Sequence, residues 1–304
     1  EVQLLSSDQT SPFQWIVGLY YLNDKNFDSF VIDQPGYYYQ SIRDLKTDSY
    51  AAYAQASYYF TDVLRVTAGG RYTSDQKEFV STSFDTFEPD YGTLDQEDKF
   101  ERFTWRLGVE AFLNPRHMLY ASVSTGFRSG GFNGASTTNP NLSPTFDTER
   151  VTAYEIGSKN QFWGGRAQVN LSAYYNDFTN LQLQNQFSLP NSTVSSSGVL
   201  NAGSARAYGL EIESLFRPTR ELTLNATASI LNARFTDYSF VGRPSAFYPI
   251  QPIDLSGNRI GHMPFYKFTV GAAYDFVIPG FGTITPRASA VISGKYYNTD
   301  YNTV

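Results

Sequence analysis

The chain has 304 residues, of which 16% are aromatic and only 17% are charged, with a formal net charge of −6 at pH 7. Nucleic-acid-binding surfaces are usually basic, so this acidic balance argues against a nucleic-acid partner. The absence of cysteine excludes disulfides and thiolate metal sites, and no run of 18 apolar residues exists that could form a transmembrane helix. A polar chain can still cross a membrane as a β-barrel, because only alternate residues then face lipid.

Alternation of apolar and polar residues recurs along the chain and predicts β-strands. In 103–111, for example, Phe103, Trp105 and Leu107 alternate with polar residues such as Thr104 and Arg106. We expect about twelve antiparallel strands, near residues 1–7, 12–23, 45–60, 65–79, 98–113, 117–129, 148–162, 166–179, 200–216, 221–236, 264–277 and 282–297. Most exceed the ordinary strand length of about 5–6 residues, and about 9–11 residues suffice to cross a bilayer.

The connections between these strands alternate between short and long. Short connections are expected near 61–64, 114–116, 163–165, 217–220 and 279–280. Long connections are expected near 24–44, 80–97, 130–147, 180–199 and 237–263. In an antiparallel meander every second connection lies at the same end, so one end is predicted to carry tight turns and the other long loops. Outer-membrane barrels have this asymmetry.

The glycine-rich stretch 119–134 (LYASVSTGFRSGGFNG) permits two interpretations. It could be a phosphate-binding loop, or the place where a strand leaves the sheet and enters a loop. A phosphate-binding loop needs a helix behind it, whereas the following residues contain two prolines and no helical period. We therefore interpret the stretch as the outward exit of a strand.

Charged residues indicate which face of the strands meets lipid. Arg71, Arg106 and Glu211 all alternate with apolar neighbours and so lie on the polar face. A Lys or Arg facing lipid at the bilayer midplane costs about 2–4 kcal/mol. The apolar face is thus predicted to contact hydrocarbon and the polar face to line a lumen. The alternative, a soluble β-sandwich or barrel that binds carbohydrate, would place the apolar face inside.

Aromatic residues near the strand ends favour the membrane interpretation. The apolar faces are rich in Ala, Thr and Gly, while aromatic side chains such as Phe13, Tyr21, Tyr175 and Phe276 fall towards the ends of the predicted strands. This distribution is typical of an aromatic girdle at the membrane surface rather than of a packed core.

Five segments together resemble the barrel of TonB-dependent outer-membrane receptors. They are TDVLRVTAGGRYTSDQKEF (61–79), LYASVSTGFRSGGFN (119–133), YEIGSKNQFWGGRAQVNLSAYYNDFTNLQ (154–182), NAGSARAYGLEIES (201–214) and DLSGNRIGHMPFYKFTVGAAYDF (254–276). The resemblance covers nearly all strands in order and leaves the long loops unmatched.

This resemblance implies an all-β fold, an antiparallel transmembrane β-barrel meander with about 12 strands of a 22-stranded barrel. It also implies location in the outer membrane of a Gram-negative bacterium and active uptake of a scarce ligand, most often a ferric siderophore. The family's energy comes from TonB, which acts through an N-terminal box and plug that are not present in this chain. The chain ends at YNTDYNTV rather than in an aromatic-terminated strand, so residues 1–304 are expected to be a partial receptor barrel. Lipopolysaccharide and outer-membrane lipid are the expected surroundings.

No residues predict covalent chemistry, and we expect neither an enzyme nor a cofactor. The two histidines, His117 and His262, fall at a short turn and a long loop, on opposite sides of a bilayer core of about 30 Å. Glu211 and Glu213 could form a carboxylate pair, but a charge ladder with Arg and Lys of neighbouring strands is the favoured interpretation.

An acidic stretch at 81–99 could gather calcium or could form a solvated surface near lipopolysaccharide and its divalent ions. Its acidic residues do not follow the spacing of a dedicated calcium loop, so the solvated surface and no metal site are predicted. The acidic residues are Asp85, Glu88, Asp90, Asp95, Glu97 and Asp98.

Ligand contacts are expected from polar and aromatic residues of the long loops. Clustered tyrosines can stack on aromatic or sugar rings, or lie at the lipid headgroup level. The candidates are Tyr37, Tyr38, Tyr39, Arg128, Phe132 and Asn133. Alternative functions remain open: a passive or substrate-specific porin, or uptake of an oligosaccharide or cobalamin instead of iron.

Overall fold

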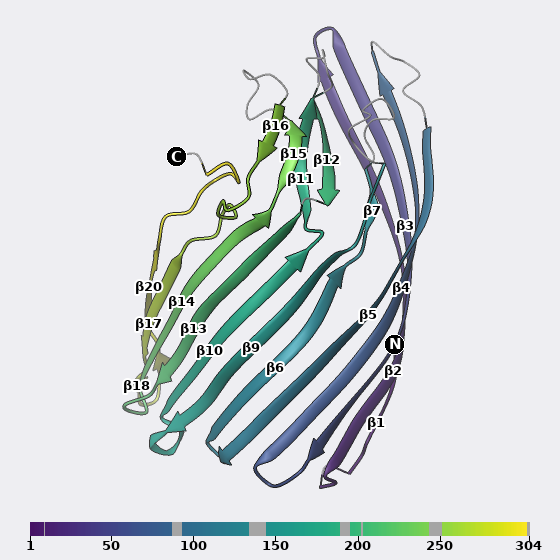
Figure 1. Ribbon diagram of the computed structural model, residues 1–304. Coiled ribbons are helices and arrows are strands. Elements are labelled where there is room, and N and C mark those ends of the chain that lie inside the picture. The colour runs from purple at the N-terminus through teal and green to yellow at the C-terminus, as the bar shows by residue number, and fades with distance from the viewer. Residues whose placement is uncertain are drawn as a thin grey trace.

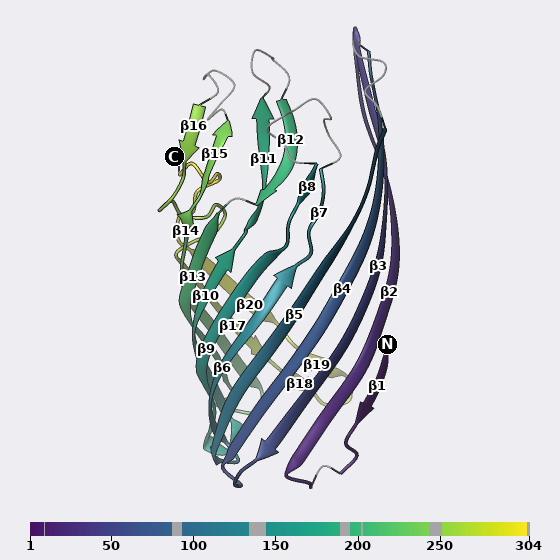
Figure 2. The ribbon, with the colours of Figure 1, turned by 45° about the vertical axis from the view of Figure 1, so that its right-hand side comes forward.

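The computed structural model describes residues 1–8, 10–86, 93–133, 144–188, 195–201, 203–242 and 251–302. Twelve long or medium strands form one antiparallel sheet that runs as a meander and curves around an open interior (Figures 1 and 2). In order across the sheet they are β1 (Val2–Leu5), β2 (Phe13–Gln34), β3 (Tyr37–Tyr59), β4 (Leu64–Asp85), β5 (Thr93–Asn114), β6 (His117–Arg128), β9 (Glu149–Phe162), β10 (Ala167–Thr179), β13 (Ser204–Phe216), β14 (Leu222–Asp237), β17 (Tyr266–Tyr274) and β20 (Arg287–Ser293). The predicted fold class and meander are confirmed.

In the described residues, four short strand pairs lie within the connections between the strands of this sheet. At the upper end in Figure 1 they are β7 (Gly131–Phe132) with β8 (Thr145–Phe146), β11 (Gln182–Ser188) with β12 (Ser195–Asn201), and β15 (Ser239–Gly242) with β16 (Gln251–Asp254). At the lower end β18 (Phe276–Ile278) pairs with β19 (Gly282–Ile284). We call the upper end the loop end and the lower end the turn end. Among the described residues, none of the helical segments has the length and apolar character needed to cross a membrane.

The predicted long connection at 24–44 is wrong. β2 continues to Gln34 and β3 begins at Tyr37, and the two strands pair in register along their whole length. Only Pro35 and Gly36 join them, and Gly36 has φ 81°, as the third position of a type II turn requires. Together with β4, which pairs with β3 as far as Tyr39, the hairpin extends past β6 at the loop end (Figures 1 and 2).

Two further predicted boundaries are also wrong. The connection expected at 80–97 is shorter, because β4 runs to Asp85 and β5 begins at Thr93. The strand expected at 282–297 is divided into β19 and β20 and ends at Ser293. In each case the strand ends where pairing with the neighbouring strand stops, which apolar periodicity alone does not reveal.

On the apolar face the alternate side chains carry no charge over stretches nine residues long, which match the about 9–11 residues needed to span a bilayer. They are residues 13–21, 50–58, 64–72, 103–111, 154–162, 208–216 and 266–274. Their alternate large side chains are open to the surroundings, with Trp15 and Trp105 being 37% and 40% exposed, and Leu171 on the same face of β10 is 44% exposed. We call this side of the sheet the lipid face and the opposite side the inner face.

Aromatic side chains cluster at both ends of the uncharged segments. Near the loop end Tyr21 lies 5.0 Å from Tyr50, and Tyr175 stacks on Tyr208 at 6.3 Å, all distances being between ring centroids. Near the turn end the corresponding ring pairs are Tyr58–Phe60, Trp163–Phe216 and Tyr274–Phe276. These two aromatic belts are what a membrane-spanning barrel places at the two membrane surfaces.

Polar and charged side chains occupy the inner face. Arg65 forms an ion pair with Glu110 and lies over the rings of Tyr59 and Phe112, at 5.4 and 5.2 Å. Glu211 and Glu213 also lie on this face, but the described contacts include no direct ion pair for either. In the register Asn170 separates Lys159 from Glu213, and Ser229 separates Glu211 from Lys267. The prediction that these carboxylates join Arg and Lys of the neighbouring strands is therefore wrong for the described contacts, because uncharged polar residues lie opposite both of them in the register.

This assignment of faces can be tested with two adjacent lysine substitutions on β14. Ala226→Lys places an ammonium group on the lipid face at mid-span and should lower the free energy of unfolding by about 2–4 kcal/mol. Thr227→Lys places the same group on the inner face, beside Glu213 in the register. This substitution should change the free energy of unfolding by less than about 0.5 kcal/mol. Urea unfolding of the full-length receptor in lipid vesicles measures both. Equal losses for the two variants would contradict the assignment.

Candidate functional site at the loop end

A segment that follows β6 packs against the inner face of the sheet at the loop end. The Phe132 ring stacks on Phe79 of β4, with centroids 5.5 Å apart and planes at 12°, and meets the edge of Phe100 of β5 at 6.5 Å. Phe79 and Phe100 are both buried. The glycine-rich exit from β6 is thus anchored by aromatic packing, as its interpretation as a strand-to-loop exit requires, and no helix follows it in the described residues.

Two cations of the inner wall bind the two ends of this segment. The Lys77 ammonium donates to the carbonyl oxygen of Gly130 at 2.6 Å. The Arg102 guanidinium donates to the buried hydroxyl oxygen of Thr148 at 2.8 Å through Nη2 and 3.2 Å through Nε. Burial lowers the pKa of Lys77, Arg128 lowers it further, and the Asp75 carboxylate opposes both effects.

Amide side chains connect the same segment to the β11–β12 hairpin. Gln182 donates through Nε2 to the carbonyl oxygens of Ser129 and Asp147, each at 3.0 Å. Asn133 is buried and exchanges two hydrogen bonds with the backbone of Val199, at 2.8 and 2.9 Å. These bonds pair partly buried backbone groups, so they hold the base of the 129–148 connection in one position.

A small apolar core lies under the neighbouring hairpins. It is built from Ala205, Phe235, Tyr238, Phe240, Ile253 and Leu255. The segment near the C-terminus joins this region, because Asn302 accepts from the backbone of Arg259 at 2.7 Å and donates back to it at 2.7 Å. The loop end therefore consists of packed structure over β9–β17 and a projecting hairpin wall over β2–β5 (Figure 2).

The three candidate tyrosines lie in strand β3 near the tip of the β2–β3 hairpin, so their predicted loop location is wrong. Alternation along the strand places Tyr37 and Tyr39 on the inner face and Tyr38 on the opposite face. Tyr39 meets the Phe30 ring at 6.3 Å, whereas Tyr38 meets Phe84 at 6.0 Å. They therefore cannot act as one continuous stacking platform.

The other candidates are brought together on the inner face. Arg128 ends β6 with an exposed side chain, close to Lys77, and Phe132 and Asn133 follow within the anchored segment. Of these three, Arg128 is the one that remains accessible to a ligand in the described structure. The roles of Lys77, Arg102 and Gln182 at this site were not predicted. The alternation of polar residues along β4 and β5 places Lys77 and Arg102 on the inner face, but nothing in the sequence indicates which loop groups they bind.

The remaining titratable candidates are separated in space. His117 begins β6 at the turn end, where Nδ1 lies 3.1 Å from Asn160 Oδ1, and His262 precedes β17 at the loop end, where its backbone N–H donates to the Tyr297 carbonyl oxygen. In the acidic stretch, Asp95 and Glu97 lie on the lipid-face side of β5 and Asp98 on the other side. Glu88 and Asp90 lie outside the described residues. In the described part of the chain no group of three or more potential ligands could hold a metal ion.

Comparisons with known proteins agree with this architecture. The family described as TonB dependent receptor-like, beta-barrel matches residues 3–304, and the chain belongs to this family. It is 24% identical over 288 residues to the pesticin receptors of Yersinia pestis and Yersinia enterocolitica, covering 93% of this chain and 38% of each relative. The chain thus spans well under half the length of these relatives.

Solved structures show the same fold. The ferric yersiniabactin uptake receptor FyuA from Yersinia pestis matches with a TM-score of 0.80 and 19% identity, over 99% of this chain and 43% of that one. The siderophore receptor PiuA from Acinetobacter baumannii matches with a TM-score of 0.67 and 15% identity, over 96% and 47%. The chain is a transmembrane β-barrel portion of a Gram-negative outer-membrane protein.

Removing the Asn133 side chain tests whether it fixes the base of the 129–148 connection. Asn133→Ala leaves a partly buried N–H and carbonyl of Val199 without these partners, which should lower the free energy of local opening by about 1–3 kcal/mol. Amide hydrogen exchange at Val199 should then accelerate by roughly 10- to 100-fold. Asn133→Asp keeps one acceptor and should give an intermediate rate. Unchanged exchange in the alanine variant would show that other contacts suffice.

Proposed function

We propose that the chain is part of an outer-membrane receptor that takes up a ferric siderophore by TonB-dependent active transport. The observation that carries the proposal is the division of one family-typical sheet into an uncharged lipid face and a charged inner face. Such a barrel gives a polar path across the membrane. The FyuA structure named above is described as a ferric yersiniabactin uptake receptor and the PiuA structure as a siderophore receptor, which supports iron over other ligands.

The inner face performs binding and positioning rather than covalent chemistry. Arg128 offers an exposed guanidinium beside the anchored segment, and an anionic ferric chelate would gain charge-assisted hydrogen bonds there. Tyr37 and Tyr39 extend the inner wall outward along the hairpin and offer aromatic surface to a passing ligand. Phe132 and Asn133 would contribute indirectly, by holding the segment that follows Arg128.

The remaining parts of the transport cycle are assigned to the rest of the receptor. TonB would act through an N-terminal box and plug, and residues 1–304 would supply about 12 of 22 barrel strands. Outer-leaflet lipopolysaccharide and membrane lipid would surround the lipid face. No enzymatic step is required, since binding energy and TonB-driven work suffice for uptake.

Growth of a deletion strain complemented with the full-length receptor tests this function. Iron-limited growth on a supplied ferric siderophore should require both the receptor and TonB. Growth that persists without TonB would indicate a passive porin, and rescue by an oligosaccharide or cobalamin but not by iron chelates would redirect the ligand assignment.

Arg128 gives a site-level test of the same proposal. Arg128→Ala should weaken binding of the ferric siderophore by about tenfold, the value of one charge-assisted hydrogen bond, while Arg128→Lys should retain part of the affinity. Equilibrium binding to the purified full-length receptor measures both. Unchanged affinity in the alanine variant would remove Arg128 from the ligand site.

A further inference from the structure

The pairing between β5 and β6 stops well short of the loop end of β5. The β5–β6 ladder ends at Arg106, which lies opposite Ser124. On its other side β5 stays paired with β4 as far as Thr93. Towards the loop end β5 and β6 diverge (Figure 2). Residues 93–103 of β5 therefore form a strand edge that is paired on one side only, and we call this stretch the β5 edge.

Backbone groups of alternate residues point towards the open side of the β5 edge. The Trp105 N–H points to β6, where it donates to the Thr125 hydroxyl at 3.0 Å, so the N–H and C=O groups of the other odd-numbered residues face the same way. The Lys99 N–H is bonded to the carboxylate of the adjacent Asp98 at 2.7 Å. For the other odd-numbered residues of 95–103, the described contacts include no hydrogen bond on this side. Such a row of backbone groups is a template for pairing with another strand.

The β5 edge lies outside the hydrocarbon layer and between two strands of the described sheet. It starts at Phe103, the loop-end limit of the lipid-face segment 103–111, and runs away from the membrane. Hydrocarbon does not tolerate an open edge, whereas water does. On the open side the next strand in the sheet order is β6, which pairs with β9 as far as Arg128. No strand of the described sheet therefore lies between β5 and β6.

Side chains close the opening between β5 and β6 on the inner face and leave the opposite side accessible. Phe132 meets the ring of Phe100, and Arg102 donates to Thr148, both from the inner face. On the lipid-face side, the odd-numbered side chains of 93–103 are all exposed. An approaching strand would reach the β5 edge from this exposed side.

The exposed side chains of the β5 edge are mainly acidic. Asp95, Glu97 and Glu101 lie on it together with one cation, Lys99, which contacts Glu101 at 2.5 Å. Across the part of the chain that the structure describes, neither Asp95 nor Glu97 has a cation within ion-pair distance. Two carboxylates of the edge are thus available to a basic partner.

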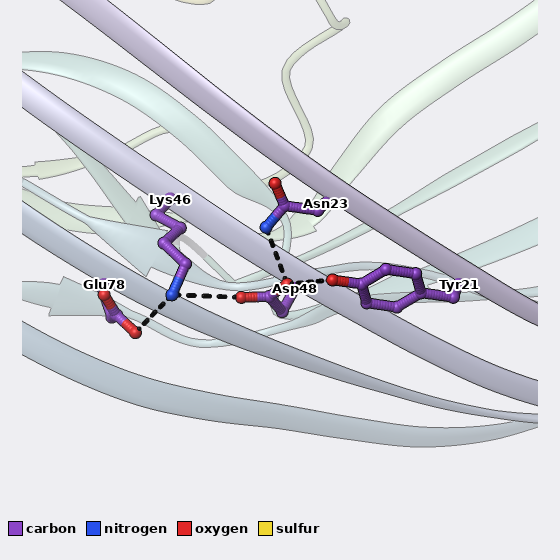
Figure 3. Close-up of polar contacts among 5 residues, drawn as sticks. All are labelled: Tyr21, Asn23, Lys46, Asp48 and Glu78. Carbon is purple, nitrogen blue, oxygen red and sulfur yellow. Dashed lines mark hydrogen bonds and ion pairs between the residues drawn. The ribbon is translucent and has the colours of Figure 1, made fainter.

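Glu97 has a further reason to attract a cation. It lies directly opposite Glu78 of β4 in the register, and like charges in this position destabilise a sheet. Lys46 contacts Glu78 at 2.9 Å and neutralises it from the β3 side (Figure 3). A cation on the open side of Glu97 would complete this row of alternating charges.

The charge of the β5 edge selects the kind of strand that can pair with it. A second copy of the chain, pairing edge to edge, would place one net acidic edge against another and would be repelled. An apolar strand would leave the carboxylates without partners, which is how charged residues protect edges from unspecific pairing. A strand with Lys or Arg at every second position would bring a cation opposite each acid while its main chain pairs with the edge.

We propose that the β5 edge binds an extended, basic segment of an external polypeptide by strand addition. The segment pairs its main chain with the odd-numbered residues of 95–103 and places Lys or Arg side chains opposite Asp95, Glu97 and Glu101. Main-chain hydrogen bonds supply affinity, and the cross-strand charge pairs supply specificity. The inference goes beyond siderophore uptake and does not depend on which ligand is transported.

Fluorescence anisotropy with labelled synthetic peptides and the full-length receptor in lipid nanodiscs tests the proposal. The probe is a short peptide in which Lys and Thr alternate, and its control has the same composition with all Lys before all Thr. Alternation places every lysine on one face of a strand, so the wild type should bind the probe about tenfold or more tightly than the control. N-methylation of only the lysines or only the threonines blocks one edge of the peptide, so one of these two changes should abolish binding and the other should spare it.

Charge reversal on the protein tests the same site. Asp95→Lys with Glu97→Lys should weaken binding of the probe about tenfold or more and should create binding of a peptide in which Glu and Thr alternate. Asp33→Lys with Asp44→Lys is the matched control, because it reverses two exposed acids on the lipid-face side of β2 and β3. The control variant changes the net charge by the same amount and should keep the affinity of the wild type for the probe.

Three outcomes would overturn the proposal. They are equal affinity of the wild type for the alternating and the control peptide, equal loss of probe binding in the two double variants, and equal effects of the two N-methylated peptides. Siderophore uptake by the Asp95/Glu97 variant should stay at the wild-type level. Loss of peptide binding with normal uptake thus separates the β5 edge from the transport function, and failure of uptake in the wild type would bear only on the latter.

Discussion

The requirement that every backbone N–H and C=O be paired inside a bilayer determines most of this structure. Hydrocarbon offers no hydrogen-bonding partner, so strands can cross it only as members of a continuous sheet. The registers between β2 and β17 accordingly run through the nine-residue lipid-face segments, except between β5 and β6. There the ladder begins at Arg106, opposite Ser124, and the Trp105 N–H donates to the Thr125 hydroxyl instead. Hydrocarbon also disfavours charged side chains on the lipid face, so Arg65, Glu155 and Glu211 lie on the inner face.

Above the membrane the constraint on the side chains is lifted while the constraint on the backbone remains. The β2–β3 hairpin continues its ladder to Pro35 and Gly36, but both of its faces now carry polar and charged residues. The lipid face changes over a short distance from apolar residues to tyrosines, then to lysines and carboxylates. This order follows the order of chemistry in the leaflet it meets, from acyl chain to ester level to phosphate and sugar.

At the loop end, hydrogen bonds from side chains to the backbone, rather than pairing between strands, hold the connections in place. Lys77, Arg102, Gln182 and Asn133 each bind the connection after β6 or the hairpin beside it. Because such bonds pair partly buried backbone groups, they fix the base of this connection. Arg128 is thereby presented at the edge of a rigid support, which is the property a ligand-contacting residue needs.

The sequence by itself determined the strands inside the membrane, the two faces and the asymmetry of the two ends. Where lipid and lumen oppose each other, burial imposes a strict period of two, as in 103–111. The sequence did not determine the extension of β2 and β3, because residues 24–44 have water on both sides and do not keep the period of two. The Pro35–Gly36 turn was the only local signal of this hairpin.

Only the tertiary structure decided how Tyr37, Tyr38 and Tyr39 divide between two faces, and which loop groups Lys77 and Arg102 bind. It also placed Lys25 opposite Lys46. These facts depend on register and on contacts between residues far apart in the chain, which local periodicity cannot encode.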